Sequence, residues 1–556
     1  MPAVPNVSRQ SAIQAIEEQF SVDKTMLESL VERFQELYHY GLANHGADMQ
    51  MIPSFVTGVP DGSEKGTYLA LDLGGTNLRV CEVALDGKGT FTIKQEKYKV
   101  SEQLKRGPVR DLFDYMATSV DNFLTDFGTA STDDVLFLGF TFSFPVEQTA
   151  IDRGHLIHWT KGFDCPDAPG KDVVQLLQDA LDRKHIKVKC SALVNDTVGA
   201  LLAHAYASNG ALISAIFGTG TNGAYLEDIS KITKLKSAQG SITHMVINTE
   251  WGGFDDDRKA LPVTIFDNQL DRQSIRPRNH VFEKMISGMY LGEVARLVLL
   301  HLIDQLVLFQ GFSSAILNTQ YGFDTAYMSA IEADNEPASS SSSATRKVLV
   351  QTLSIKDEYI STEDIETVRT VCKIVGTRAA RLSATAIAAT MIQTGNVQST
   401  GPQDQGVKVG VDGSVIEFYP RKSSTRIRAA HLIESELTLR LFTVSLPHMQ
   451  TLRSVSEALC ASSSAKRARS VSRLVSPRTE VVWEVSTRQP KQMTRTCERE
   501  RDLTSDHFLP EQLLLEPCKP PSRPPAATVS KLSSKRKNVT ASSPSVGTRS
   551  VAWTLV

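Results

Sequence analysis

Hydrophobic and polar positions alternate with two different periods along residues 11–420. Apolar residues at intervals of three and four between 11 and 44 predict two helices that pack on the rest of the protein. Farther on, apolar residues recur at every second position, and helical spacing returns between these stretches. The strands are predicted at 68–84, 91–99, 135–140 and 187–194, and the helices near 108–127 and at 199–206. Strands that alternate with helices indicate an α/β fold with a mixed sheet.

Two later stretches extend this pattern. The run Ser339–Ser343 has the composition of a linker, but the pattern resumes directly after it. We therefore interpret it as a surface loop inside one domain. Residues 361–364 have the spacing of a capping box that begins a helix, and residues 408–417 predict a strand and a turn.

A glycine turn divides the first predicted stretch, 68–84, into two strands. The first strand carries Asp72 and ends at Gly74-Gly75-Thr76-Asn77. Successive backbone N–H groups and a Thr hydroxyl at such a turn can bind a phosphate, and Asp72 is placed to hold Mg²⁺ through water. An ordinary glycine turn is the alternative for this stretch taken alone.

A second turn of the same kind decides between these readings. Residues 215–225 repeat the order of apolar strand, Gly218-Thr219-Gly220-Thr221 turn and apolar strand. Two such turns predict two similar halves that face each other across a nucleotide.

The pair of turns resembles the sugar kinase, heat-shock ATPase and actin superfamily, and the residues between them resemble the hexokinase family, its fungal members most. The motifs that carry this resemblance occur in the family's order. They are Leu138-Gly-Phe-Thr-Phe-Ser-Phe-Pro145, His158-Trp-Thr-Lys-Gly-Phe163, Val194-Asn-Asp-Thr-Val-Gly199, Asn248-Thr-Glu-Trp-Gly252 and Phe282-Glu-Lys-Met-Ile-Ser-Gly-Met-Tyr-Leu-Gly-Glu293.

The resemblance covers about residues 10–420 and implies a two-domain actin-like ATPase fold with a cleft between ribonuclease H-like domains. The helices of 1–66 would belong to the large domain, 67–206 would form the small domain, and 207–420 the rest of the large one. The implied reaction transfers the γ-phosphate of ATP, with Mg²⁺, to the 6-hydroxyl of glucose or a related hexose, the first step of glycolysis. Mannose and fructose are further possible hexoses, and a monomer or a homodimer is expected.

The resemblance also assigns the site residues. Asp196 would be the base for the sugar hydroxyl and Lys161 would carry charge on the transferred phosphoryl group. The hexose would be bound by Ser143, Thr160, Lys161, Asn195, Asp196, Asn222, Glu250 and Glu283. The nucleotide would be bound by Asp72, Gly74, Gly75, Thr76, Asn77, Arg79, Gly218, Thr219, Gly220, Thr221, Gly413 and Ser414, with Asp72 the indirect contact to the metal.

Several of these residues have simpler alternatives. Asp196 is also placed to cap a helix ahead of Thr197, and the two roles can coexist. Lys161 taken alone is a surface lysine, and Arg79 equally suits a salt bridge at a strand end. Glu250 and Glu283, taken singly, would be exposed acids. The chain departs from the family at Arg276, where Asn is common, and at His280, where Gln is common, so these changes bear on hexose affinity and preference.

Composition fits an ordinary globular protein of two or more domains, without the basic excess typical of nucleic-acid binding. Seven widely spaced cysteines fit a reducing compartment, and we expect a cytoplasmic protein without a secretory signal or a structural zinc site. The most apolar stretch, 291–309, contains Glu293, Arg296 and Asp304 and predicts a packed helix, not a membrane span.

The character of the chain changes after Pro420. Only Gly547 of the 34 glycines lies beyond it, and residues 421–556 hold about twice as many basic as acidic side chains. We expect this Ser- and Arg-rich tail to be disordered and not to match the family, which would continue with a second Asp-Gly-Ser-Gly turn against the adenosine pocket. Our hypothesis is translation in an altered frame or across an unspliced intron, and a regulatory tail is the alternative.

Two rival functions follow from these observations. A catalytically impaired hexose-binding sensor or regulator would keep the sugar residues and lack part of the nucleotide site. A heat-shock-type ATPase would share both glycine turns, but the Trp159–Phe163 and Asn248–Trp251 motifs would serve no purpose in it. Sugar affinity without ATP affinity would favour the sensor.

Overall fold

The computed structural model describes residues 8–74, 77–127, 135–208, 211–235, 242–395 and 408–420, and the backbone of 481–484. Gly75 and Thr76 of the first glycine turn lie outside the described residues, as does the expected tail apart from 481–484. The described residues all belong to one compact unit.

The first sheet has five strands in the order β4-β3-β2-β5-β8. Its strands are β2 (Lys65–Leu73), β3 (Asn77–Asp86), β4 (Phe91–Lys99), β5 (Leu136–Phe142) and β8 (Val188–Val194). The hairpin β2–β3 and the pair β3–β4 are antiparallel, whereas β2–β5 and β5–β8 are parallel. The ribbon of β6 (Val146–Ala150) and β7 (Arg153–Leu156) follows β5 and was not predicted from the sequence.

The second sheet has the order β1-β11-β10-β9-β12-β13. Its strands are β1 (Ile52–Pro53), β9 (Ile213–Phe217), β10 (Thr221–Asp228), β11 (His244–Asn248), β12 (Lys408–Asp412) and β13 (Val481–Glu484). The strand β13 pairs antiparallel with β12 and comes from the segment for which we expected disorder, so that expectation is wrong for these four residues.

Both sheets repeat one plan. A hairpin joins the first two strands across a glycine turn, a third antiparallel strand lies outside the hairpin, and a later parallel strand lies beside the first. The repeat pairs β4-β3-β2-β5 with β11-β10-β9-β12. The mixed sheets and the two similar halves predicted from the turns are thus confirmed.

Helices pack their apolar faces against the first sheet. The helices here are α3 (Glu102–Arg106), α4 (Val109–Asp126) and α5 (Val173–Arg183). In α4 the residues Leu112, Met116, Val120 and Phe123 recur at helical spacing and are buried against strand residues such as Phe140. This packing confirms the helix predicted near 108–127.

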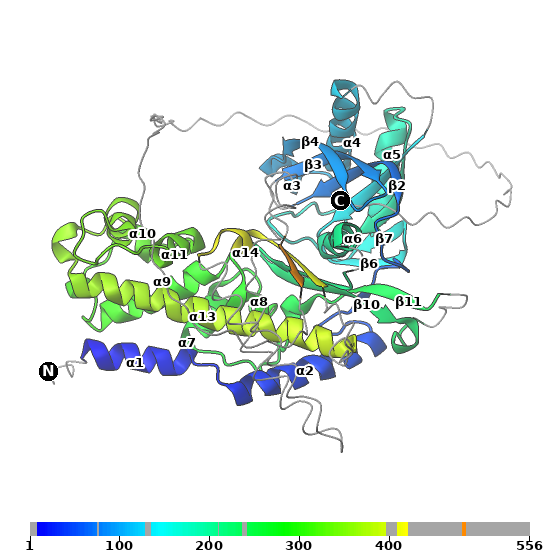
Figure 1. Ribbon diagram of the computed structural model, residues 1–556. Coiled ribbons are helices and arrows are strands. Elements are labelled where there is room, and N and C mark those ends of the chain that lie inside the picture. The colour runs from blue at the N-terminus through cyan, green and yellow to red at the C-terminus, as the bar shows by residue number, and fades with distance from the viewer. Residues whose placement is uncertain are drawn as a thin grey trace, which may run out of the picture. The chain divides into compact units, whose positions relative to one another are not determined.

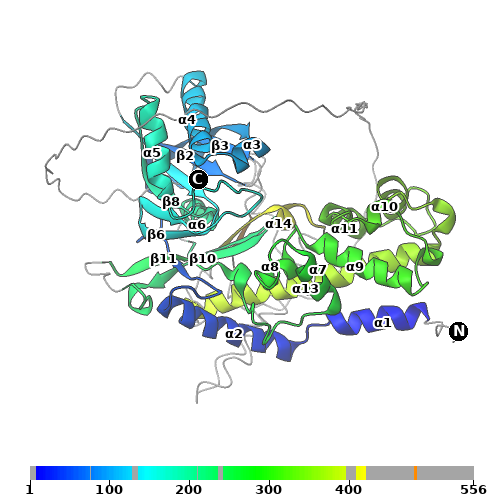
Figure 2. The same cartoon turned by 180° about the vertical axis from the view of Figure 1, so that it is seen from behind.

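The larger core lies around a long helix, α13 (Thr362–Gln393), which begins with the predicted capping box between Ser361 and Asp364. Figure 1 shows α13 running beside the N-terminal helices α1 (Arg9–Phe20) and α2 (Lys24–Ala43), and Figure 2 shows the same arrangement from behind. The other helices are α7 (Ile265–Gln273), α8 (Val281–Ile286), α9 (Leu291–Asp304), α10 (Ala315–Asn318), α11 (Thr325–Glu332), α12 (Ala344–Lys347) and α14 (Ser414–Phe418). Short helical turns lie at Ile229–Lys231, Trp251–Gly253, Phe309–Gly311, Val348–Thr352 and Asp357–Tyr359. None of the described helices is long and apolar enough to cross a membrane.

One helix, α6 (Asp196–Ser208), contacts both sheets. Its apolar residues Val198, Leu201 and Leu202 share a buried cluster with side chains from the first sheet and with Ala224 and Val246 of the second. On the second sheet the Ser214 hydroxyl donates to the Thr197 carbonyl at 2.7 Å. The N-terminal end of α6, at Asp196, is therefore fixed relative to β9.

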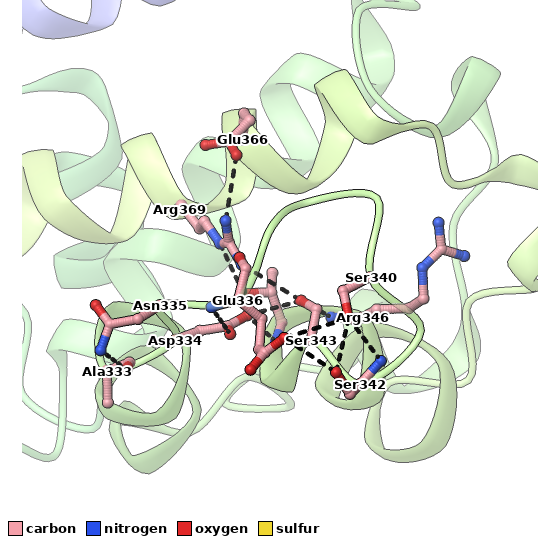
Figure 3. Close-up of polar contacts among 11 residues, drawn as sticks. Ala333, Asp334, Asn335, Glu336, Ser340, Ser342, Ser343, Arg346, Glu366 and Arg369 are labelled. Carbon is pink, nitrogen blue, oxygen red and sulfur yellow. Dashed lines mark hydrogen bonds and ion pairs between the residues drawn. The ribbon is translucent and has the colours of Figure 1, made fainter. Parts of the chain in front are cut away.

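The serine run forms an ordered loop within this fold (Figure 3). Ser340 and Ser342 both donate to a carboxylate oxygen of Glu336, and Ser343 caps α12. Asp334 accepts hydrogen bonds from Ser343 and from Arg369 on α13. The predicted surface loop inside one domain is thus confirmed.

Candidate active site

The N-terminus of α6 presents Asn195 and Asp196 just after β8 ends. The Thr197 amide donates to Asn195 Oδ1 at 2.8 Å and to Asp196 Oδ1 at 2.9 Å. Asn195 therefore takes the capping position, and Asp196, the first helical residue, shares the same amide. The Asp196 carboxylate is half-buried, and its Oδ2 atom is oriented by this contact on Oδ1.

A second group of polar residues lies where β10 and β11 run side by side. Asn222 Nδ2 donates to Asn248 Oδ1 at 2.8 Å and to Glu250 Oε1 at 3.1 Å, and Asn248 Nδ2 donates to the same Glu250 oxygen at 2.8 Å. Glu250 has a φ of 52°, which turns the chain sharply after β11. Two amides thus hold one carboxylate in place.

A third carboxylate, Glu283 of α8, closes on the second glycine turn. Its Oε2 accepts the Thr221 amide at 3.0 Å, and its Oε1 lies 3.6 Å from His280 Nδ1. A Cβ atom on Gly220 would come within 2.6 Å of Glu283 Oε2, so only glycine leaves room for this contact. Glu250 and Glu283 are half-buried rather than exposed, unlike the expectation for each taken singly.

The charges of these groups act on one another. Burial raises the pKa of Glu250; Asp196 and Glu283 raise it further, while His280 and the Asn248 hydrogen bond oppose the rise. Burial also disfavours the charged form of Glu283, but His280, the Thr221 amide and Lys161 outweigh it and lower the pKa of Glu283. These influences bring Asp196, Lys161, Glu250, Glu283 and His280 into one electrostatic neighbourhood.

The loop Trp159–Phe163 presents Thr160 and Lys161. Lys161 is exposed, with a φ of 54°, and its Nζ lies 5.6 Å from the centre of the Phe144 ring. The Trp159 ring stacks on Phe163, with ring centres 5.4 Å apart, and the Trp159 indole N–H donates to the Cys165 carbonyl. The loop is therefore anchored by its aromatic residues, and Lys161 lies exposed between them.

A small cavity joins residues from both sheets next to these groups. Phe144 and Asn195, which follow β5 and β8 of the first sheet, line it on one side, and Ile52, Ser54 and Asn248, in or next to β1 and β11 of the second, line it on the other. Ser143 is buried beside Phe144, at the end of β5. Of the expected hexose residues, Asn195 lines this cavity, together with Asn248, which holds Glu250.

The first glycine turn and its strands place the expected metal contact. Asp72 and Arg79 face each other across β2 and β3, with Asp72 Oδ2 3.2 Å from Arg79 Nη1. Arg79 is therefore a salt-bridge partner at the strand end, which is the alternative role that the sequence suggested for it. The Gly74 amide donates to the Asn77 carbonyl, and a Cβ on Gly74 would lie 3.5 Å from that carbonyl oxygen.

The second glycine turn meets the start of α14. A Cβ on Gly218 would lie 3.6 Å from Gly413 Cα and 3.8 Å from the Ser414 nitrogen. Gly413 has a φ of 117°, and any side chain there would collide with the Phe217 carbonyl group. Thr219 is held at its carbonyl by the Met289 amide.

The two glycine turns and Asp72 fit a nucleotide with bound Mg²⁺. The lack of a side chain at Gly74 and the side-chain-free approach of Gly218 to Gly413 suit phosphate groups, which need close contact with backbone. Mg²⁺ keeps several waters and takes one or two carboxylates besides substrate phosphates, which matches the single carboxylate Asp72 at this place. Within the described ranges no group of three or more His, Cys, Asp or Glu side chains forms a metal site.

Sequence reasoning missed two residues that shape the site. Asn248 is the first residue of the motif at 248–252, but its hydrogen bonds to Asn222 and Glu250 were not predicted. Asp256 accepts the backbone amides of His280 and Val281 at 2.9 and 2.7 Å and so fixes the start of α8. For Asn248 the sequence offers a signal, because Glu250 lies only two residues away. For Asp256 no neighbouring residue indicates its role.

Comparison with protein families identifies both halves of the chain. Residues 12–206 and residues 212–446 match two family profiles that are each described as hexokinase. The second match extends past Pro420 into the segment that we expected not to match, and its residues 421–446 lie outside the described residues.

Individual relatives agree with this result. A glucokinase of Aspergillus niger is 42% identical over 68% of this chain and 82% of its own length, and hexokinase-1 of Schizosaccharomyces pombe is 39% identical over 75% and 83%. Among solved structures, a hexokinase of Schistosoma mansoni complexed with glucose superimposes with a TM-score of 0.67 at 34% identity, covering 76% of this chain and 93% of that one.

Proposed function

Because this chain belongs to the hexokinase family, we propose that it transfers the γ-phosphoryl group of ATP to the 6-hydroxyl group of glucose or a related hexose. The family consists of ATP-dependent hexose phosphotransferases. The observation that carries the proposal is the proximity of Asp196 and Glu283 to Glu250, a carboxylate that the Asn222 and Asn248 amides hold in place.

A hexose requires several fixed hydrogen-bond partners, since each hydroxyl buried without a partner lowers affinity. The carboxylates of Glu250 and Glu283 accept hydrogen bonds from sugar hydroxyls, and Asn195 and Asn222 contribute amide groups. Ser143, directly after β5, and Thr160 and Lys161, on the loop after β7, supply further donors. The amide contacts on Glu250 and the Thr221 amide on Glu283 support this assignment because they pre-orient both acids.

Transfer of the phosphoryl group requires alignment, cancellation of charge and a base for the hydroxyl proton. Asp196 is the base: its Oδ1 is occupied by the Thr197 amide, and its Oδ2 accepts the proton of the 6-hydroxyl. Such a base contributes about 10²- to 10⁴-fold to the rate. Lys161 neutralises charge on the transferred group, and its exposed position on a tight turn supports that role.

On the nucleotide side, the amides around Gly74, Asn77 and Gly218–Thr221 hold the phosphates, and Gly413 and Ser414 approach the adenosine. Gly75 and Thr76 are assigned to the same role by the family motif alone. Mg²⁺ bound to ATP neutralises phosphate charge when present, with Asp72 as its contact through water. Arg79 holds the Asp72 carboxylate in orientation. We assign the reaction to the cytoplasm, which suits the thiols of Cys165, Cys190 and Cys372, none of which forms a disulfide within the described residues.

A hexose-binding sensor without catalysis is the second candidate. The change of composition after Pro420 favours it, since the family completes its adenosine pocket with residues beyond that point. In this case the sugar residues would keep their function while phosphoryl transfer would be lost.

One pair of measurements separates the two candidates. Formation of glucose 6-phosphate is followed in a coupled assay with Mg-ATP, and glucose binding is followed by tryptophan fluorescence, with Trp159→Phe as the control that assigns the signal to the loop. Glucose 6-phosphate formation supports the kinase. Glucose binding without product supports the sensor, and absence of both contradicts the family-based proposal.

A further inference from the structure

Arg276 joins the two halves of the site. It lies after α7, in the segment that leads to His280 and Glu283, and its Nη2 donates to the Trp159 carbonyl at 2.7 Å. Trp159 begins the loop that presents Thr160 and Lys161. Arg276 also lies close enough to His158 that its charge, after burial, lowers the pKa of that imidazole.

The backbone of Arg276 is fixed by buried charges. Lys284 Nζ donates to the Arg276 carbonyl at 2.7 Å and pairs with Asp271 Oδ1 at 2.7 Å. Asp271 also accepts the Arg278 amide at 3.0 Å. Lys284 and Asp271 are buried, so the segment that carries Arg276 is a rigid support.

The loop on the other side is held less firmly. Aromatic contacts of Trp159 and Phe163 anchor its two ends, but Thr160, Lys161 and Gly162 between them are half-buried or exposed. Lys161 and Gly162 both have positive φ values, 54° and 83°, and a Cβ on Gly162 would meet nothing within 4 Å. A single strong hydrogen bond to the Trp159 carbonyl therefore has a large effect on where Lys161 lies.

We propose that Arg276 is a positioning residue that holds the Trp159–Phe163 loop against the segment before α8 and so keeps Lys161 near Glu283. This inference rests on the proposed function, which gives Lys161 and Glu283 their roles. Arginine suits the task because its charge persists at every working pH and its long side chain reaches from the segment before α8 to the Trp159 carbonyl. A charge-assisted bond to a carbonyl is also stronger than a neutral one.

Hydrogen exchange of the full chain tests this without requiring activity. In Arg276→Ala we expect the amides of residues 160–163 to exchange roughly fivefold faster than in the wild type, because the loop opens more often. Arg272→Ala removes a neighbouring exposed arginine of α7 and should leave this exchange unchanged, and Arg276→Lys should give an intermediate rate. Equal exchange in Arg276→Ala and the wild type would overturn the proposal.

Steady-state kinetics with glucose and Mg-ATP tests the catalytic consequence. Arg276→Ala should lower kcat/KM for glucose about tenfold with the thermal midpoint unchanged, and the loss should be smaller when Lys161 is already alanine, since Arg276 acts through Lys161. Fully additive losses would overturn the inference. If the wild type does not phosphorylate glucose, the proposed function is refuted. The hydrogen-exchange measurement then tests the positioning role of Arg276 by itself.

Discussion

His280 Nδ1 lies 3.6 Å from Glu283 Oε1, at the start of the helix that closes on the second glycine turn. Asp256 holds the backbone of His280, and Thr221 holds the other oxygen of Glu283. The ion pair therefore connects the residue that departs from the family pattern to an acid of the proposed hexose site.

This pair predicts a pH-dependent contribution to stability. Burial opposes protonation of His280, but Glu283, Glu250 and Asp256 outweigh it and raise its pKa above 6.5, while the pKa of Glu283 is lowered below 4.5. A histidine whose pKa is raised in the folded state stabilises the fold below its ordinary pKa and loses that effect as pH rises through the folded pKa. A glutamate whose pKa is lowered stabilises the fold above its ordinary pKa and loses that effect as pH falls through the folded pKa. The pair contributes most between pH 4.5 and 6.5.

The measurement is urea unfolding of the wild type and His280→Gln at pH 5.5 and pH 8. We expect the variant to be destabilised at pH 5.5, by no more than about 1 kcal/mol for a partly exposed pair, and to approach the wild type at pH 8. His45→Gln makes the same change at an exposed site and should show no such trend. A difference that is equal at both pH values would contradict the ion-pair account.

Arg378 and Asp267 predict a larger effect on stability. Arg378 donates from Nη1 and Nη2 to the two Asp267 oxygens at 2.7 Å, and both side chains are buried. Arg378→Met would leave a buried charge without its partner, which costs about 3–5 kcal/mol. Chemical denaturation measures this, and Arg110→Met, which breaks an exposed pair, should change stability by less than about 0.5 kcal/mol. Equal effects of the two variants would contradict this assignment.

Asp334 predicts the behaviour of the serine loop (Figure 3). Its Oδ2 accepts the Ser343 hydroxyl at 2.7 Å, the Thr345 amide at 2.8 Å and Arg369 at 2.7 Å. Burial opposes ionisation, but these contacts lower the pKa of Asp334, so the loop keeps this support at neutral pH. Asp334→Ala should make trypsin cleavage at Arg346 and Lys347 about tenfold faster. Asp304→Asn, an exposed change, should cleave like the wild type, and an unchanged Asp334→Ala would refute the anchoring role.

The fold could be predicted largely from local pattern. The strands of the first sheet, α4, the N-terminal helices and the capping box at Ser361 all depend on periodicity or on neighbours in sequence. Strand β13 could not be predicted, because its four residues lie in a segment of poor periodicity and gain their order by pairing with β12.

The site was predictable where motifs carry it and unpredictable where distant residues support it. Asp196, Glu250 and Glu283 are assigned to the site by the resemblance, and the structure brings Asp196 and Glu283 close enough to Glu250 to raise its pKa. The support that Asp256 gives His280 and the bond from Arg276 to Trp159 join segments far apart in the chain. Such contacts depend on tertiary packing, which no local pattern encodes.

The role of Asp196 is the central claim, and a single-turnover measurement of phosphoryl transfer from Mg-ATP to glucose tests it most directly. Asp196→Asn keeps an oxygen for the Thr197 amide and removes the base, so folding and α6 are preserved. We predict that the transfer rate falls at least about 100-fold while the glucose Kd changes by less than about threefold. A variant that transfers the phosphoryl group within about tenfold of the wild-type rate would contradict the account.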